Sequence, residues 1–275
     1  MANILKYLYG SYTGRFILTG LTNRNVSKAA GLYLDSYLSK PLIYPFAKKN
    51  NIDLSICKRE KIYQYKNFND FFTRELKDDE RPVNMDPKCL IAPCDGLLSA
   101  YRITEGLVIP VKQSCYRIKD LLHSSELAKE FNGGIALVYR LCVNHYHRYV
   151  YVESGIKGHN HFINGVLHTV RPIALRTRPV FIENCREFTV IKTSNMGKMV
   201  QMEVGAMLVG KIDNYDLQMK KVSRGKEKGR FLYGGSTIIV LIDEEHAKYV
   251  DPRLIKATIH RKETPVRLGQ SISRI

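Results

Sequence analysis

The chain has 275 residues, with 43 Lys and Arg against 26 Asp and Glu, which gives a formal net charge of +17. A chain of this length can bury a sizeable core, either as one large domain or as one domain with a smaller extension. The excess of positive charge suits an anionic partner, either nucleic acid or an acidic lipid surface. The recognised nucleic-acid-binding motifs do not occur in this sequence, so we expect no nucleic-acid partner.

Six cysteines are scattered without Cys-x-x-Cys spacing, and the N-terminal residues show no signal-peptide pattern. They are Cys57, Cys89, Cys94, Cys115, Cys142 and Cys185. Reduced thiols inside a cell are the simplest interpretation. No uncharged apolar run approaches the roughly 20 residues needed to cross a bilayer. We therefore expect the protein to lie on a membrane rather than to span it.

The first fifty residues interleave basic side chains with apolar and tyrosine positions, as membrane-surface helices do. The basic residues are Lys6, Arg15, Arg24, Lys28, Lys40, Lys48 and Lys49. A solvated basic face is the alternative interpretation. From Val26 the apolar residues recur at helical spacing until Pro41, which predicts an N-terminal helical segment.

A second, short helix is predicted around Phe68 to Leu76, with Asn67 or Asn69 as its N-cap and Pro82 beyond its end. Arg74 would then lie on the polar side of this helix.

After about residue 88 the sequence changes to short apolar runs separated by glycine and asparagine, which is typical of β-strands. The clearest runs are Leu97 to Tyr101, Ile135 to Val143, Val200 to Ile212 and Thr237 to Ile242. Helical spacing is sparse there, with the clearest stretch at Ile118 to Phe131, so a doubly wound parallel sheet is disfavoured. We predict an α+β protein with an N-terminal helical, membrane-docking region (residues 1–87) and a mainly β core (residues 88–275).

The segment from Arg230 to Leu241 places Gly234 and Gly235 directly before Ser236, and an apolar run follows. Such a glycine pair is common at a tight turn or bulge. It also suits an internal acyl shift, in which the serine hydroxyl attacks the preceding carbonyl and replaces the peptide bond by an ester. Glycine permits the close approach and the strained backbone that this step needs. Elimination would then leave dehydroalanine, and hydrolysis would convert it to a pyruvoyl group.

The sequence resembles the prokaryotic-type phosphatidylserine decarboxylase proenzymes at several separated places in the proper order. Asn69 to Leu76 resembles the family's FFTR segment, Ala92 to Gly96 its P-x-D-G segment and Asn144 to Arg148 its YHR segment. His168 to Pro172 resembles the VNP element, Glu183 to Glu187 the N-x-R element and Val204 to Ile212 the VGA-x-x-VG element. Lys226 to Phe231 leads into Gly-Gly-Ser-Thr. Together these segments span most of residues 10–242.

This resemblance implies a decarboxylase whose pyruvoyl group derives from Ser236, with self-cleavage after Gly235 into a large chain (1–235) and a small chain (236–275) that stay associated. The substrate amine would form a Schiff base with the pyruvoyl ketone, and loss of CO2 would convert phosphatidylserine to phosphatidylethanolamine. No external cofactor is then required. The substrate lies in an anionic membrane, so the resemblance implies a peripheral protein on the cytoplasmic face of the cell membrane. The sequence leaves the oligomeric state open, a homo-oligomer included.

The resemblance also implies the residues that act with Ser236. Asp95 matches the family aspartate that supports self-cleavage, although Pro93-Cys-Asp-Gly is also good turn chemistry. The family usually reads Y-H-R-x-H, where the second histidine serves self-cleavage and the first protonates the decarboxylated intermediate. Here the first is His147, and Val150 occupies the second position. Either His147 serves both steps or His168 replaces the missing ring.

Arg74 and Arg186 fall in family motifs and could pair with the phosphate or carboxylate of the lipid, or form structural ion pairs. Arg171 stands where the family usually has asparagine, so it is a less specific candidate. The pairs His145/His147 and His159/His161 would each share a strand face, which raises a zinc hypothesis. Acids and cysteines do not lie at ligand spacing, so we expect no metal site.

Two other functions remain open from the sequence. The chain could be a non-cleaving, catalytically inactive relative that binds lipid, or a soluble pyruvoyl-dependent amino-acid decarboxylase. The basic and apolar N-terminal segment argues against the soluble enzyme.

Overall fold

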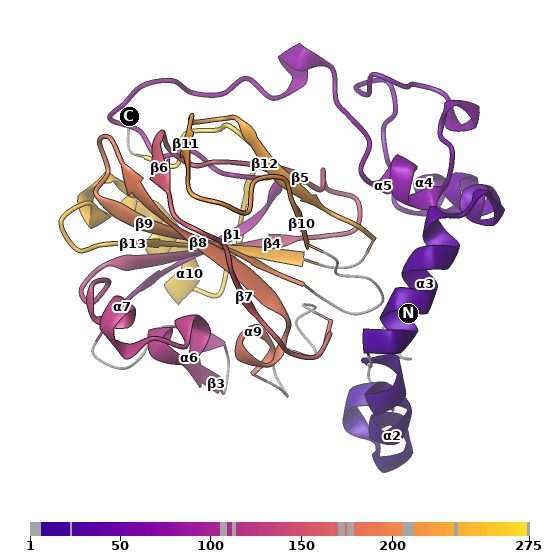
Figure 1. Ribbon diagram of the computed structural model, residues 1–275, viewed down its shortest axis with the longest axis horizontal. Helices are drawn as coiled ribbons and strands as arrows, with labels where there is room; N and C mark the ends of the chain where they lie inside the picture. Colours follow the sequence, from indigo (N-terminus) through magenta and orange to yellow (C-terminus); the bar gives the residue numbers. More distant parts are fainter. Residues whose placement is uncertain are drawn as a thin grey trace.

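The computed structural model describes residues 7–22, 24–104, 109–111, 114–169, 174, 179–205, 212–233 and 236–273. Helices come first along the chain and a mainly antiparallel β body follows (Figure 1). The predicted mainly β architecture is thereby confirmed, and the predicted absence of a doubly wound parallel sheet agrees with the strand order.

The N-terminal helices stand beside the β body, at the right of Figure 1. They are α2 (Tyr12–Leu21), α3 (Arg24–Asp35), α4 (Ile43–Lys49) and α5 (Phe68–Phe72), with 3-10 turns η1 (Tyr37–Leu42), η2 (Ile62–Gln64) and η3 (Asp78–Glu80). Helix α3 confirms the predicted helix but ends before Pro41, because Ser36 has extended backbone angles (φ −84°, ψ 154°). Pro41 lies inside η1 instead.

Helix α5 is capped by Asn67, whose side chain accepts a hydrogen bond from the Asp70 N–H at 2.8 Å. Of the two predicted caps, Asn67 is therefore the right one. The helix has five residues and Thr73 is its C-cap, so helical periodicity no longer sets the direction of Arg74. The predicted position of Arg74 on the polar side of this helix is wrong, because its side chain is buried and only 4% of the residue is exposed.

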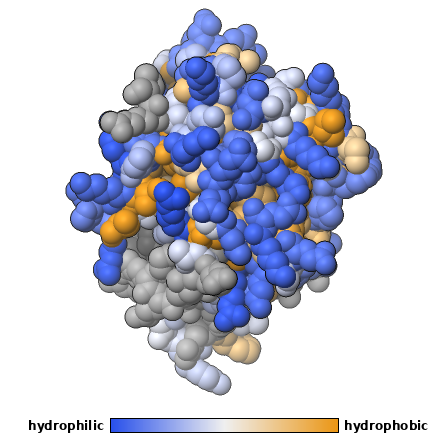
Figure 2. Space-filling view, turned by 90° about the vertical axis from the view of Figure 1, so that its left-hand side faces the viewer, coloured by the Kyte–Doolittle hydropathy of each residue, from blue (hydrophilic) through white to orange (hydrophobic). Residues whose placement is uncertain are grey.

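Several apolar side chains on the N-terminal helices are exposed. We call six of them the N-terminal apolar residues: Tyr12, Phe16, Leu32, Tyr37, Leu38 and Tyr44. Figure 2 shows the side of the molecule that is on the left in Figure 1, away from these helices, and that side is mostly hydrophilic. Within the part of the chain that the structure describes, no helix is both long and apolar enough to pass through a bilayer.

Within the described residues, nine strands form the main sheet, and each neighbouring pair is antiparallel. In spatial order they are β11 (Lys220–Val222), β6 (Gly155–Lys157), β8 (Arg186–Thr193), β9 (Lys198–Val204), β13 (Ser236–Ile242), β4 (Ile135–Leu141), β1 (Gly96–Arg102) and β14 (Thr264–Val266), and β7 (His161–Ile163) also pairs with β8. A three-stranded sheet holds β10 (Ile212–Asn214), β12 (Glu227–Phe231) and β5 (Arg148–Val150), and β2 (Ile109–Val111) pairs with β3 (Ser114–Tyr116).

Two predicted elements are divided in the structure. The run from Val200 to Ile212 contributes to β9 and, at its far end, to β10, while residues 206–211 lie outside the described part. The predicted helix over Ile118 to Phe131 becomes α6 (Ile118–Leu122) and α7 (Ser125–Lys129). The break occurs because His123 is left-handed (φ 50°) and Ser124 caps the new helix.

The main sheet buries side chains on both faces. Along β13, Ile239 and Leu241 belong to a core that includes residues of α6, α7 and α9 (Val180–Glu183). Ile238 and Val240 point to the other face, where the core includes residues of the three-stranded sheet and the C-terminal segment. We call the face that carries Ile239 and Leu241 the α6 face, and the face that carries Ile238 and Val240 the β5 face. The C-terminal segment adds η4 (Ala247–Tyr249) and α10 (Pro252–Ile259).

Candidate active site

Four neighbouring strands of the main sheet bring predicted site residues to one of its ends. Strand β1 begins at Gly96 and β13 begins at Ser236, and they lie on opposite sides of β4, which ends there at Leu141. Strand β9, on the other side of β13, also ends there. Asp95, the turn that follows β4 and Ser236 therefore gather at this end, because antiparallel neighbours alternate in direction.

Ser236 is fully buried, with 0% of the residue exposed, and it pairs with Leu141 of β4. Its place in the alternation of β13 puts its side chain on the β5 face, together with Ile238. Among the described residues, no group forms a hydrogen bond with Ser236 Oγ. A buried hydroxyl without a partner is costly, and Thr237 Oγ1, on the next residue, shares this state. Gly235, the other predicted cleavage-site residue, lies outside the described residues.

His147 is also fully buried, and a backbone hydrogen bond places it on the side of the β5 face. Its main-chain carbonyl accepts a hydrogen bond from the Phe231 N–H at 2.9 Å, and Phe231 belongs to the core of that face. Its ring lies against Phe72 of α5, with ring centroids 4.1 Å apart. The backbone pairing and the ring contact hold this imidazole near the end of β4.

The hydrogen bonds of His147 determine its tautomer. Nδ1 lies 2.9 Å from the His145 carbonyl oxygen, and since a carbonyl can only accept, Nδ1 carries the proton. Burial lowers the pKa of His147 well below its ordinary value, and the nearby Arg74 charge lowers it further. The ring is thus neutral near pH 7, with a lone pair on Nε2. No described residue bonds to Nε2, so this nitrogen can accept a proton.

Arg74 holds the turn that carries the two histidines. Its Nη2 donates to the carbonyl oxygens of Asn144 at 3.2 Å and His145 at 3.3 Å. Burial lowers its pKa, and its Nε has no hydrogen-bond partner among the described residues. These contacts show that Arg74 positions the turn. Its Nε–H remains available as a donor to another group.

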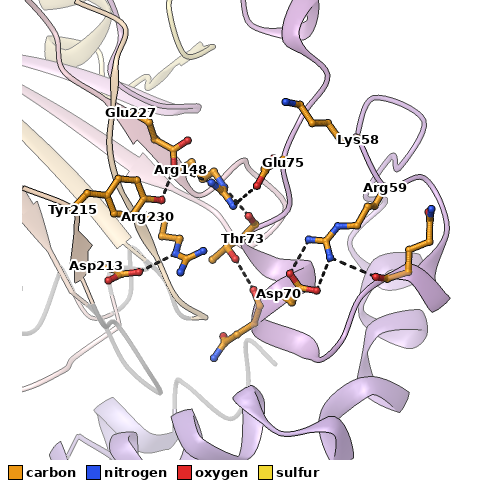
Figure 3. A network of polar contacts seen from close by, with 12 residues as sticks. Lys58, Arg59, Asp70, Thr73, Glu75, Arg148, Asp213, Tyr215, Glu227 and Arg230 are labelled. Carbon is orange, nitrogen blue, oxygen red and sulfur yellow. Dashed lines mark hydrogen bonds and ion pairs between the residues drawn. The ribbon is translucent and has the colours of Figure 1, made fainter. Parts of the chain in front are cut away.

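Arg148, the residue after His147, ties β5 to the segment that follows α5 (Figure 3). Its guanidinium donates to the Thr73 carbonyl at 2.8 Å, to Glu75 at 3.2 Å and to Glu227 of β12 at 2.9 Å. Tyr215 donates a further hydrogen bond to Glu227 at 2.6 Å. The turn that carries His145 and His147 is therefore held both by the segment that follows α5 and by β12.

Asp95 is held by arginine rather than by histidine. Arg81 donates to both carboxylate oxygens, at 2.8 Å and 2.6 Å, and the Leu268 N–H donates to one of them at 2.9 Å. Among the described residues, no histidine hydrogen-bonds to Asp95. Strand β4 separates Asp95 from Ser236, a backbone spacing of roughly 10 Å. Asp95 raises the pKa of His145, although burial lowers that pKa more.

His168 lies at the same end of the sheet but in different surroundings. The Asn184 side chain binds its main chain and also the Gly205 carbonyl next to the end of β9. The imidazole contacts Tyr9 Oη at 3.3 Å and Glu183 Oε2 at 3.4 Å. Tyr9 belongs to the core of the α6 face. His168 is therefore grouped with the face opposite to Ser236 and His147.

The remaining candidates have other surroundings. Arg186 is fully buried and donates to the carbonyl oxygens of Leu121, Ile182, Asn184 and Asp120. This is a structural use of the guanidinium, because these bonds tie β8 to α6 and α9. Arg171 lies outside the described residues.

The expectation that His145 and His147 share a strand face is wrong, because both lie in the turn before β5. Within the described part of the chain, no cluster of three or more His, Cys, Asp or Glu residues is suited to hold a metal.

A buried ion pair on the β5 face was not expected from the sequence. Lys228 of β12 donates to Glu203 of β9 at 2.5 Å and to Asn214 at 2.9 Å. Burial raises the pKa of Glu203, and its Oε1 has no hydrogen-bond partner in the described part of the chain. Ile238 is directly opposite Glu203, so Ser236 is its diagonal neighbour. The signal in the sequence that could have revealed this pair is the charged residue Glu203 inside the apolar run Val200 to Val204.

The fold and the site together define a mainly antiparallel β protein with a buried serine and a neutral histidine at one end of its sheet. A family model described as phosphatidylserine decarboxylase matches residues 68–274. The chain is 37% identical over 269 residues to the phosphatidylserine decarboxylase proenzyme 2 of Clostridium acetobutylicum, covering 98% of this chain and 90% of that protein. It is 38% identical over 271 residues to the phosphatidylserine decarboxylase proenzyme of Clostridium beijerinckii, covering 98% and 91%. It is 35% identical over 272 residues to the phosphatidylserine decarboxylase proenzyme of Desulfitobacterium hafniense, covering 98% of this chain and 91% of that protein.

The chain therefore belongs to the phosphatidylserine decarboxylase family. The resemblance found in the sequence is confirmed, and so is the expectation of a decarboxylase enzyme.

The depressed pKa of His147 predicts how stability depends on pH. Below about pH 6.5 the unfolded chain binds a proton at this residue and the folded chain does not, so stability is lost as the pH falls. We expect His147 to contribute a slope of up to about 1.4 kcal/mol per pH unit in the Ser236→Ala variant. Denaturant unfolding between about pH 7.5 and about pH 5 measures it.

In the Ser236→Ala variant, adding His147→Gln should reduce the dependence of stability on pH. Part of the dependence should remain, because the pKa of His145 is also lowered. His159→Gln is the control because His159 is exposed. An equal slope with and without His147 would contradict the buried, neutral imidazole.

Proposed function

We propose that this chain is a self-cleaving proenzyme that becomes a pyruvoyl-dependent phosphatidylserine decarboxylase, forming phosphatidylethanolamine and CO2. One observation carries the proposal: a fully buried serine hydroxyl and a buried, neutral imidazole nitrogen lie toward the same face of the sheet, each without a described partner. The names of the relatives, which are proenzymes of this activity, support the same conclusion.

Self-cleavage needs a base, because a serine hydroxyl is a weak nucleophile. His147 Nε2 accepts the proton of Ser236 Oγ as the oxygen attacks the Gly235 carbonyl carbon. The C–N bond breaks, the Ser236 nitrogen takes up a proton, and an ester joins the two parts of the chain. Loss of the Ser236 α-proton then expels the Gly235 carboxylate and leaves dehydroalanine. Water converts this group to the pyruvoyl ketone and ammonia.

The residues around Ser236 fit a pyruvoyl group, since the orphaned hydroxyl and the free Nε2 leave the reacting position open to chemistry. The ketone supplies a Schiff base and an electron sink for decarboxylation. His147 Nε2, which carries a lone pair in the resting ring, would take up a proton from the substrate ammonium and give it to the substrate carbon after CO2 leaves, and the low pKa of the ring favours this release. The carboxylate of Asp95 stabilises positive charge on the histidine turn, and the Nε–H of Arg74 suits an anionic headgroup oxygen.

The proposed products stay associated because β13 is a central strand. Every residue of β13 is buried, and the strand pairs with β4 on one side and with β9 on the other. The small chain (236–275) would therefore remain bound to the large chain (1–235) after cleavage.

The membrane is the proposed location of the substrate, on the cytoplasmic face of the cell membrane. Residues 1–87 would form the docking region and residues 88–275 the catalytic core. The N-terminal apolar residues support this proposal together with the exposed Lys28, Lys48 and Lys49, because apolar and basic side chains together bind anionic bilayers. Lys6 lies outside the described residues, and so do the side chains of Arg15 and Arg24. Cys57, Cys89, Cys94, Cys142 and Cys185 are free thiols, which agrees with a reducing compartment. The side chain of Cys115 lies outside the described part of the structure.

The first prediction separates the enzyme from a non-cleaving, lipid-binding relative. Purified wild-type protein should contain a fragment of residues 236–275 with an N-terminal pyruvoyl group, and Ser236→Ala should stay intact and inactive. Intact-mass spectrometry and CO2 release from phosphatidylserine measure these outcomes. Ser99→Ala, at another buried serine of the sheet, is the control and should cleave. An active, unbroken wild-type chain would refute the proposal.

The second prediction distinguishes the two candidate bases. His147→Ala should slow self-cleavage by about 10²-fold or more, because general base catalysis contributes about that much. His168→Ala should cleave at a rate close to that of the wild type, because the His168 side chain is grouped with the α6 face. Fragment formation after cell-free synthesis gives both rates. The opposite pattern would assign the base to His168.

The third prediction concerns docking. Phe16→Ser/Leu38→Ser should bind less to vesicles that contain phosphatidylserine, because two exposed apolar side chains are lost. Ile259→Ser is the control, since Ile259 is as exposed as Leu38 but lies on α10. Vesicle sedimentation measures binding. Equal losses in both variants would show that the N-terminal helices have no special part in docking.

A further inference from the structure

Helix α5 connects the N-terminal helices to the chain that precedes Ser236, and its central contact is the side chain of Asn69. Asn69 Oδ1 accepts a hydrogen bond from the main-chain N–H of Tyr233 at 3.1 Å. Its Nδ2 donates to Asp35 Oδ1 at 2.9 Å. A main-chain N–H can only donate and an ionised carboxylate can only accept, so the two partners fix the orientation of the amide. The residue is 2% exposed.

Tyr233 is held by its ring as well as by its backbone. The ring packs edge to face against Phe72 at 5.2 Å and Phe68 at 5.0 Å, measured between ring centroids. Phe72 also contacts the ring of His147 at 4.1 Å. The same short helix therefore contacts the chain before the reacting serine and the proposed base.

Two glycines separate Tyr233 from Ser236. Glycine has the widest backbone freedom of any residue, so the direction of the Gly235 carbonyl depends on how the chain is anchored on each side. Strand β13 anchors one side, because Ser236 is its first residue. The hydrogen bond from Tyr233 to Asn69 anchors the other. An intramolecular attack is fast only when the reacting atoms are kept close and aligned.

We infer that Asn69 is a positioning residue for self-cleavage, and that Asp35 orients Asn69 for this role. The inference rests on the proposed function, because it assumes that Ser236 attacks Gly235. It also links α3 to the reaction, since Asp35 is the last residue of that helix. Asn67 donates to the Asp35 carbonyl at 2.6 Å and strengthens the same junction without contacting Tyr233.

An exchange of the two side chains tests the inference. Asn69→Asp puts a carboxylate against that of Asp35 and should slow fragment formation about ten-fold or more, because a charge-assisted hydrogen bond is replaced by repulsion. Asp35→Asn keeps an acceptor for Asn69 and should have a small effect. The double variant Asn69→Asp/Asp35→Asn restores a donor and an acceptor at the contact. Its rate should return to within about three-fold of the wild-type rate.

Asn67→Asp is the matched control. It adds the same charge on the same helix near Asp35, and aspartate caps a helix as well as asparagine does. Its cleavage rate should stay within about two-fold of the wild-type rate, because Asn67 does not hold Tyr233. Rates come from the appearance of the 236–275 fragment after a pulse of cell-free synthesis of the full chain. Thermal unfolding of each variant in the Ser236→Ala background shows whether it is folded.

The outcomes separate the inference from the proposed function. If the wild type cleaves and Asn69→Asp cleaves equally fast, or if the double variant is as slow as a folded Asn69→Asp, the positioning role is refuted while self-cleavage stands. If the Asn69→Asp variant is slow only because it is unfolded, the role is also refuted. A wild-type chain that gives no fragment overturns the proposed function and the inference with it.

Discussion

The pairing of β13 with β4 and β9 is the constraint on which the site depends. Hydrogen bonds on both sides of β13 fix where Ser236 lies along the sheet and which face its side chain meets. A shift of one residue would move Ser236 from the β5 face to the α6 face, because side chains alternate along a strand. The buried apolar residues on both faces of β13 make such a shift costly. The core of the protein thus sets the position of Ser236.

Around this fixed strand, buried polar groups prepare the site at a cost in stability. Asp95 receives its hydrogen bonds from Arg81 and from the Leu268 main chain, while Arg74 fixes the histidine turn through carbonyl oxygens. These pairs leave the hydroxyl of Ser236 and the Nε2 of His147 without described partners. The free energy lost at two unpaired groups is offset by extensive apolar burial in the same core. Under the proposed function, positioning and reactivity therefore fall to different residues.

Local patterns in the sequence predicted much of this arrangement. The apolar runs of β1, β4 and β13 were visible because these strands are largely buried, and the motif resemblance proposed Ser236, Asp95 and His147 as site residues. The break at His123 was not predictable, because it depends on a left-handed residue inside a helical pattern. The burial of Arg74 and the pair Glu203–Lys228 were missed for another reason. Their partners are distant in sequence, and no periodicity encodes them.

The location of the glycine pair has a consequence for the mature protein. Cleavage would create two chain ends of very different freedom. The new N-terminus is part of a paired central strand and cannot leave its place, whereas the new C-terminus ends a tether of only two glycines after Tyr233. The proposed cleavage would thus leave the reactive group on the firmly held side of the cut, and any later rearrangement would fall to the chain that ends after Tyr233.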